Sequence, residues 1–171
     1  MPRSRAIAEV AFIALGSNLG EPLEQLRWAR RSLESLGEVI ESSSLWRTAP
    51  VGGPEGQPDY LNAVVALNPE TLEPGTLLGR LLRLENERGR ERNLRWGART
   101  LDLDLLAFGG EVRTSDFLTL PHPRMMERAF VLAPLCEVAP DWQHPIAKKR
   151  ACDVLTRFPT EGVARTDLTW T

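Results

Sequence analysis

The chain has 171 residues, 42% of them hydrophobic, which is enough for one core and too few for two independent domains of ordinary size. We therefore predict a single domain over residues 1–171, with less sequence signal beyond about residue 141. Lys and Arg number 21 against 23 Asp and Glu, so the net charge of -2 excludes a general nucleic-acid-binding or anionic-membrane surface. Any anion site must be local.

The two cysteines, Cys136 and Cys152, form no CxxC pair and belong to no cluster with zinc-ligand spacing. We expect both thiols to be free, as in a reducing compartment. The opening segment resembles a signal peptide in its early arginines and apolar run, but Glu9 interrupts that run. No apolar run approaches the roughly 20 residues of a membrane span. We expect a soluble, cytoplasmic monomer without a cleaved leader.

The first part of the chain combines apolar segments with one helical pattern. Residues 6–15 favour a strand that ends in the turn-rich GSNLGEP, after which Pro22 is well placed to start a helix. Apolar residues then recur at helical spacing up to Leu36, and Gly37 predicts the stop. Residues 39–48 predict a second strand. The following APVGGPEGQPD predicts a long loop, of the kind that often carries function.

The middle of the chain predicts a third strand and a second helix. In the strand YLNAVVALN, Tyr60 and Asn62 share one face while the residues between them take the other. In the helix, leucines share one face, and steps of four residues from Leu77 lead to Glu85, so the apolar stripe ends in a carboxylate. We expect Glu85 to be half buried and to need an arginine, a metal-bound water or a ligand as its partner.

The elements that follow complete an alternating order. An arginine-rich connection leads to the strand TLDLDLLAF, and residues 127–138 predict a third helix despite Pro134. The order strand, helix, strand, strand, helix, strand favours the α+β class. It predicts a ferredoxin-like sandwich of the split βαβ type, in which helices pack on a mostly antiparallel sheet.

Two aspartates lie inside the strand TLDLDLLAF. Its leucines should face the core while Asp102 and Asp104 face the other side, with their Cα atoms about 7 Å apart. Carboxylates at this spacing can converge on hard cations such as Mg²⁺, which is usually held by one or two carboxylates plus substrate phosphates. The alternative is a strand face that simply meets water, because a DxD pattern alone is a weak motif.

A dense arginine cluster precedes these aspartates, with only Glu91 opposing it. Its members are Arg88, Arg90, Arg92, Arg95 and Arg99. Guanidinium groups match phosphate oxygens, and metal ions bridge phosphates to carboxylates, so a nucleoside triphosphate with Mg²⁺ would satisfy both sets. The alternative is a solvated loop paired with neighbouring glutamates. The sequence contains neither a P-loop nor the dinucleotide-binding fingerprint.

Other residues could bind a heterocycle. Tyr60 and Asn62 share a strand face beside the loop rich in proline and glycine, and Trp96 lies among the arginines. With Phe130 they offer stacking faces and an amide for a heterocycle's edge, although core packing is the commoner role of any single aromatic. His122, between two prolines, is more often structural but could donate to a phosphate.

The chain resembles the 6-hydroxymethyl-7,8-dihydropterin pyrophosphokinase family of folate biosynthesis over residues 12–140. Four blocks occur in the family's order: FIALGSNLG, WRTAPVGGPEGQPDYLNAVVAL, RWGARTLDLDLLAFG and LPHPRMMERAFVLAPLCEVAP. The resemblance implies that the diphosphoryl group of ATP is transferred to the pterin's hydroxymethyl oxygen and that AMP is released. It also implies that Asp102 and Asp104 bind two Mg²⁺ ions between the triphosphate and the pterin hydroxyl.

The remaining site residues also follow from the resemblance. Positions that hold or adjoin ATP are Glu85, Arg90, Arg92, Arg99, His122 and Arg128. Those that line the pterin pocket are Thr48, Val51, Tyr60, Asn62, Trp96 and Phe130, with Tyr60 and Phe130 on either side of the ring. Arg90 and Arg99 join the two aspartates as the catalytic set. Ala98 and Pro123 stand where family members have proline and, in some cases, tyrosine.

Two other functions stay open on the residues alone. A ferredoxin-like module could bind a nucleotide through the arginines without chemistry, and such binding would not require metal. A nucleotidyltransferase also uses a DxD on a strand, but it releases diphosphate instead of AMP. RNA is disfavoured because the net charge is -2 and the paired aspartates would repel a phosphate backbone.

Overall fold

The computed structural model describes residues 9–50, 55–88 and 101–171, and all that follows concerns these ranges. The elements in chain order are β1 (Ala11–Ser17), α2 (Pro22–Leu33), β2 (Gly37–Ser42), β3 (Trp46–Thr48), β4 (Tyr60–Pro69), α3 (Pro74–Glu87), β5 (Asp102–Phe108), β6 (Arg113–Thr114), β7 (Thr119–Leu120), a 3₁₀ turn (Met125–Glu127), α4 (Ala129–Val138), α5 (Ala151–Leu155) and β8 (Val163–Arg165).

The main sheet is antiparallel at every described pairing. Its strands follow the order β5-β1-β4-β3-β8, and β2 also pairs with β4. Because β2 and β3 lie one after the other along the same edge of β4, they count as one interrupted strand. The result is a strand-helix-strand-strand-helix-strand unit with β1 and β4 at its centre, which is the predicted ferredoxin-like α+β sandwich.

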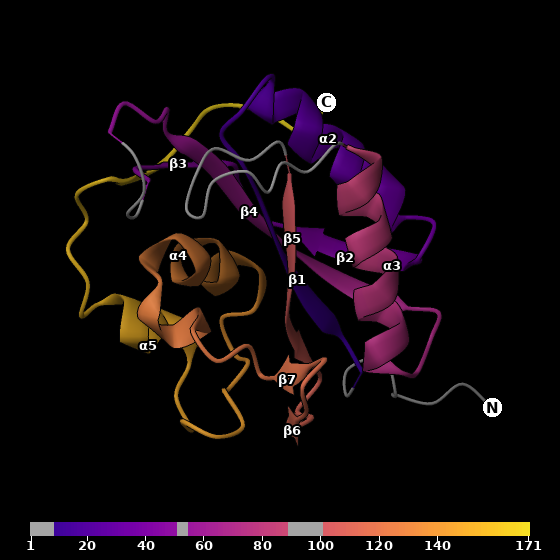
Figure 1. Cartoon of the computed structure of the whole chain (residues 1–171). Coiled ribbons are helices and arrows are strands. Elements are labelled where there is room, and N and C mark those ends of the chain that lie inside the picture. The colour runs from indigo at the N-terminus through magenta and orange to yellow at the C-terminus, as the bar shows by residue number, and fades with distance from the viewer. Residues whose placement is uncertain (1–8, 51–54, 89–100) are drawn as a thin grey trace.

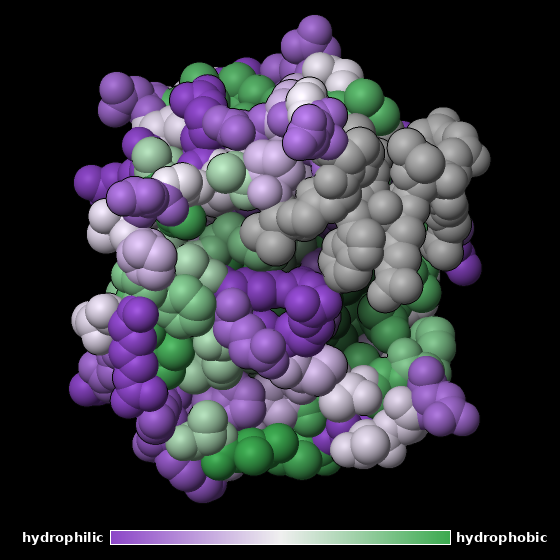
Figure 2. Space-filling model, turned by 60° about the vertical axis from the view of Figure 1, so that its left-hand side comes forward, coloured by the Kyte–Doolittle hydropathy of each residue, from purple (hydrophilic) through white to green (hydrophobic). Residues whose placement is uncertain are grey.

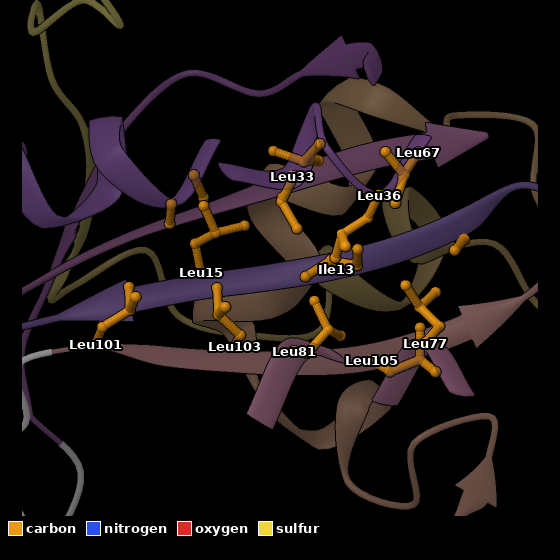
Figure 3. Close-up of a cluster of buried hydrophobic side chains, with 14 of the residues drawn as sticks. Ile13, Leu15, Leu33, Leu36, Leu67, Leu77, Leu81, Leu101, Leu103 and Leu105 are labelled. Atoms are coloured by element: carbon orange, nitrogen blue, oxygen red, sulfur yellow. The ribbon is translucent and has the colours of Figure 1, made fainter. Parts of the chain in front are cut away.

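Helices cover both faces of this sheet (Figure 1). Helices α2 and α3 pack on one face over a cluster that includes Ile13, Leu15, Leu103 and Leu105 (Figure 3). Helices α4 and α5 pack on the other face over a second cluster that includes Phe12, Val64 and Leu106. The second layer covers the sheet incompletely, and the site described below lies on the part of this face beyond α4.

The alternation predicted for β5 is present. Leu101, Leu103 and Leu105 are buried in the cluster under α2 and α3, so Asp102 and Asp104 emerge on the opposite face. The ladder with β1 shifts at Phe12 and Ile13, which pair with Ala107 and Leu105, so Leu106 has no counterpart on β1. Its carbonyl accepts instead from the His122 amide at 2.8 Å. This bulge lies just past the aspartates, at the point where the strand becomes buried on both faces.

Two of the expected boundaries are wrong. Residues 39–48 form two strands, because the Ser43 amide donates to the Val64 carbonyl and the Ser43 hydroxyl accepts from the Val64 amide, which ends the regular ladder. Helix α2 ends at Leu33, before the predicted stop at Gly37. Gly37 starts β2 instead, and it is needed there because a Cβ would lie 2.2 Å from the Asn68 carbonyl oxygen.

The expectation of two free thiols is also wrong. Cys136 of α4 and Cys152 of α5 form a disulfide, with Cα atoms 5.0 Å apart. The two helices pack against each other and bring together residues separated by 16 positions in sequence. The two cysteines are close because the helices pack together, and their spacing in the sequence does not reveal it.

The C-terminal residues, which carry little sequence signal, are structured. Strand β8 extends the sheet beyond β3, and the Trp170 indole donates to the Ser43 carbonyl at 2.8 Å. The Arg27 guanidinium donates to the Thr169 carbonyl and holds the end of the chain on α2. None of the helices in the described ranges is long and apolar enough to cross a membrane.

Candidate active site

A cavity of about 600 Å³ opens on the sheet face that α4 and α5 leave partly uncovered. Its floor comes from β5, β1, β4 and β3, and its walls come from the segment around the start of α4 and from residues 158–163. The space-filling view shows hydrophilic side chains gathered beside a hollow, with hydrophobic ones bordering them (Figure 2). The lining residues argued below are Gly16, Thr48, Tyr60, Asn62, Asp102, Asp104, His122, Arg128 and Phe130.

Small residues of β1 leave room beside the aspartates. Asp102 lies opposite Gly16, and Asp104 lies opposite Ala14, so neither carboxylate has a large neighbour across this ladder. Gly16 also lies opposite Asn62 on its other side, where a Cβ would come within 2.7 Å of the Asn62 Oδ1 atom. The row Asp102, Gly16, Asn62 therefore forms an open floor with a polar group at each end.

At the end of the floor away from Asp102, Asn62 and Thr48 form a buried polar pair. The Asn62 amide Nδ2 donates to the Thr48 hydroxyl at 2.6 Å, and both residues are at most 8% exposed. Tyr60 lies opposite Thr48 in the β3–β4 ladder, on the same face as Asn62. The bond to Thr48 fixes the orientation of the Asn62 amide, so its oxygen is presented toward Gly16 and the cavity.

Two nitrogen-bearing side chains, those of His122 and Arg128, line the cavity together with the aspartates. Burial, with help from Arg128 and Arg124, lowers the pKa of His122 to about 4, so the ring is neutral near pH 7. Its Nδ1 accepts from the Arg124 amide at 3.2 Å, which places the proton on Nε2 as a donor. Burial and Arg124 lower the pKa of Arg128 while Asp104, Glu127 and Asp102 raise it, and the guanidinium stays charged.

A second cavity of about 250 Å³ adjoins the first and shares Asp104 and His122 with it. Its walls are mostly apolar side chains of α3, of β5 and of the segment at residues 117–119.

Glu85, at the edge of the second cavity, is only 2% exposed, more buried than expected. The Leu103 amide, between the two aspartates, donates to Glu85 Oε2 at 2.7 Å, a class of partner that the sequence did not suggest.

Comparison with known proteins places this geometry in a family. Residues 12–140 match the 7,8-dihydro-6-hydroxymethylpterin-pyrophosphokinase (HPPK) family. The chain belongs to this family. It is 48% identical over 133 residues to the 2-amino-4-hydroxy-6-hydroxymethyldihydropteridine pyrophosphokinase of Haemophilus influenzae, covering 77% of this chain and 82% of that protein. It is 44% identical over 156 residues to the Pseudomonas aeruginosa enzyme of the same name, covering 90% and 94%.

Solved structures support the same fold at low sequence identity. A Plasmodium falciparum HPPK-DHPS crystal structure with pteroate superposes with a TM-score of 0.75 at 12% identity. The match covers 92% of this chain and 47% of the Plasmodium chain, so the pyrophosphokinase domain described here spans about half of that protein.

The structure brings together every predicted site residue that it describes. Asp102, Asp104, His122 and Arg128 line the larger cavity together with Tyr60, Asn62, Thr48 and Phe130, and Glu85 lines the smaller one. The other predicted residues, Val51, Arg90, Arg92, Trp96 and Arg99, lie outside the described residues.

The arrangement of Asp102 and Asp104 is compatible with a bound Mg²⁺ ion. Within residues 9–50, 55–88 and 101–171, no group of three or more acidic, His or Cys side chains converges as a full metal cage. Mg²⁺ does not need one, because it is commonly held by one or two carboxylates and completes its shell with water and substrate oxygens. Two half-buried carboxylates beside Gly16 and Ala14 leave the space for such a shell.

Sequence reasoning missed three features of the larger cavity and its surroundings. Gly16 could have been found, because a glycine inside a strand often marks a close approach of another group. Asn18 was assigned to a simple turn, yet it is 1% exposed and donates to Gln57 Oε1 and the Pro58 carbonyl, which anchors the segment before Tyr60. The wall at residues 158–163 had no sequence signal at all.

Proposed function

We propose that this pyrophosphokinase binds its acceptor and the transferred diphosphoryl group in the larger cavity and the nucleoside end of ATP in the smaller one. The chain transfers the diphosphoryl group of ATP to the hydroxymethyl group of 6-hydroxymethyl-7,8-dihydropterin in folate biosynthesis. The hydroxymethyl oxygen bonds to the β-phosphorus, the bond between that phosphorus and the oxygen bridging to the α-phosphorus breaks, and AMP leaves. The hydroxyl proton is released.

The observation that carries this assignment is the order of groups along the cavity. The Asn62–Thr48 pair and Tyr60 lie at one end, and the aspartates lie two strands away on β5. Asp104 and His122 line both cavities, so a nucleotide in the smaller one would extend its phosphates past them. A donor in one cavity and an acceptor in the other would then meet beside the aspartates, and holding reactants in this way lowers the entropic part of the barrier.

The pterin would lie between Tyr60 and Phe130, with its polar edge toward Asn62. The amide oxygen held over Gly16 can accept from a pterin N–H, and the bond to Thr48 keeps that oxygen from rotating away. Phe130 lies beside Arg128, whose Cζ is 5.6 Å from the ring centroid. One wall therefore supplies both an apolar face for a ring and a cation for phosphate.

Arg128 and His122 would hold the phosphates in the same cavity as the aspartates. The guanidinium supplies charge and the neutral imidazole donates from Nε2, so the two act differently on phosphate oxygens. Arg90, Arg92 and Arg99 are assigned to the same phosphates by the resemblance alone, as Val51 and Trp96 are to the pterin.

Asp102 and Asp104 would hold Mg²⁺, two ions if the resemblance applies in full. Bound there, the metal would offset phosphate charge and favour the ionised form of the acceptor hydroxyl. The carboxylates themselves keep phosphate oxygens at a distance by repulsion when no metal is present. Substrate turnover should therefore depend on the metal more steeply than pterin binding does.

The test is the release of AMP from ATP, with and without the pterin acceptor, in Mg²⁺ and in EDTA. We expect AMP only when acceptor and metal are both present. Binding of ATP that persists in EDTA, with no AMP under any condition, would instead support a non-catalytic nucleotide-binding module. Release of diphosphate instead of AMP would indicate a nucleotidyltransferase.

We also propose that residues 1–171 act as one domain and as a monomer. The support for a single domain is continuity, since one sheet includes strands from Ala11 to Arg165 and the C-terminal Trp170 packs back on its core. Sedimentation at concentrations used for catalysis would test the oligomeric state.

A further inference from the structure

The C-terminal segment contributes to the larger cavity. Phe158, Glu161, Gly162 and Val163 all line it, although none belongs to a motif that the sequence singled out. Of these, Phe158 is a half-buried aromatic on the connection between α5 and β8. Among the residues that the structure describes, Tyr60, Phe130 and Phe158 each present a six-membered aromatic ring to the cavity.

Sheet pairing places this segment at the acceptor end. Val163 lies opposite Thr48 in the β3–β8 ladder, and the Ala49 amide donates to the Gly162 carbonyl at 2.9 Å. Strand β5, which carries the aspartates, stands at the other end of the strand order. The segment therefore borders the residues assigned to the pterin and lies across the sheet from those assigned to metal and phosphate.

The segment is anchored on both sides. Before it, α5 packs against α4 and is joined to it by the Cys136–Cys152 disulfide. Phe158 itself packs on the same apolar cluster that supports Phe130. After it, Gly162 has a φ of +76°, and a Cβ there would lie 3.4 Å from the Ala49 Cβ. The wall is held by tertiary contacts at each end, which is what a residue that positions a substrate requires.

We propose that residues 158–163 form the outer wall of the acceptor subsite and that Phe158 contacts the pterin as a third aromatic surface. This inference rests on the proposed function, because it takes the pterin as the occupant of the larger cavity. An aromatic side chain fits this role since a pterin is a flat heteroaromatic ring that gains from apolar and ring contacts. The C-terminal segment would then contribute to acceptor affinity without contacting ATP.

The experiment compares Phe158→Ala, Phe158→Leu and Gly162→Ala with a control on the same tail, Leu168→Ala. Leu168 is 38% exposed and lies beyond the wall, so it matches the change in apolar surface without touching the cavity. The readouts are KM for the pterin and KM for ATP, together with direct pterin binding in the presence of α,β-methylene-ATP, whose bridging carbon blocks transfer. Melting temperature checks the fold of each variant.

We expect Phe158→Ala to raise the pterin KM and dissociation constant by about five-fold or more, as loss of a ring stacked on a base does. The ATP KM should stay within about two-fold, because the segment lies at the other end of the strand order from β5 and the loss of stacking affects only the ring that stacks. Phe158→Leu keeps the apolar packing and should show part of the loss. Gly162→Ala should raise the pterin KM, because a residue with a Cβ is strained at the φ of +76° and the strain shifts the wall. Leu168→Ala should behave as the unchanged protein.

Pterin constants that do not change in both Phe158→Ala and Gly162→Ala would overturn the inference. So would equal rises in the pterin and ATP KM, because a general loosening of the fold affects both substrates. Failure of the proposed function is distinguishable, since it appears as absence of AMP from the unchanged protein. The direct binding assay still reports the effect of Phe158 on the pterin in that case.

Discussion

At the scale of single residues, the carboxylates of Asp102 and Asp104 are the groups on which the proposed reaction depends most. Both lie half buried on the face of β5 that lines the cavity, opposite the small residues Gly16 and Ala14. Replacing either by Asn keeps the size and shape of the side chain but removes the charge that would hold Mg²⁺ and turns one acceptor oxygen into an NH₂ donor.

We expect Asp102→Asn and Asp104→Asn each to lower kcat by about 100-fold or more, the scale of losing one preorganised electrostatic group in an active site. Melting temperature should change little, because both side chains reach the cavity. Asp116→Asn is the matched control, since Asp116 is exposed on the loop before β7. Turnover near the normal value in both β5 variants would contradict the assignment of these aspartates.

Gly16 offers a test of the acceptor site at a residue that carries no functional group. In Gly16→Ala the new Cβ would lie 2.7 Å from Asn62 Oδ1 and force the amide away from Thr48. We expect the pterin KM to rise by about ten-fold, the value of one hydrogen bond of roughly 1.4 kcal/mol. Gly79→Ala is the control, because nothing lies within 4 Å of a Cβ there. It should stabilise α3 by up to about 1 kcal/mol and leave KM unchanged. Equal pterin KM values for the two variants would refute the role of Asn62.

His122 predicts a pH dependence of stability. Its pKa is about 4 in the folded protein against 6.5 for the ordinary group, so between these values the unfolded chain binds more protons. The free energy of unfolding therefore rises with pH in that window, and its His122 part is lost as the pH falls from 6.5 to 4. The loss should reach at most about 3 kcal/mol. Urea unfolding at several pH values should show a shallower dependence for His122→Asn, and equal slopes would contradict the prediction.

At the scale of elements, packing between neighbouring segments decides how the site is held. Strand β5 is at the end of the described strand order, so on its outer side it has no described strand to pair with. Glu85 of α3 accepts the Leu103 amide there, and this bond fixes the strand between the two aspartates. Glu85, at the end of the apolar stripe of α3, therefore both holds the edge strand β5 and lines the smaller cavity.

The contact between α4 and α5 predicts a stabilising disulfide. The cysteines enclose a loop with a separation of 16 residues, and closing such a loop stabilises a fold by about 3 kcal/mol in the chain-entropy description. We expect the double variant Cys136→Ala, Cys152→Ala to lose about this free energy of unfolding under non-reducing conditions. The unchanged protein with a reductant serves as the control and should lose a similar amount, whereas the variant should not respond. A protein whose stability is the same with and without reductant would show that the bond does not form.

At the scale of the whole molecule, local patterns predicted much of the architecture. Alternation in residues 101–105 placed the leucines in the core and the aspartates on the opposite face, as observed. The four-residue steps ending at Glu85 predicted its helix, but Glu85 is fully buried where half burial was expected, and the Leu103 amide was not foreseen as its partner. These features depend on periods of two and 3.6 residues, which any stretch of sequence displays directly.

Features that join distant segments were not predictable in this way. The interruption between β2 and β3 depends on Ser43 meeting Val64, and the disulfide depends on α4 meeting α5. The wall at Phe158 exists because β8 pairs with β3 across more than a hundred positions of sequence. No periodicity within a segment encodes such a pairing.

The sequence by itself therefore predicted the strand-helix-strand-strand-helix-strand order, the core faces of β5 and α3, the chemistry of the paired aspartates and, through four motif blocks, the family. Only the tertiary structure decided which groups share a cavity. It set Asn62 against Gly16 and Thr48, placed His122 and Arg128 in the same cavity lining as the aspartates, and brought the C-terminal segment beside Thr48. The physical reason is that periodicity is a local property of the chain, whereas a binding site is a meeting of side chains that only long-range packing brings together.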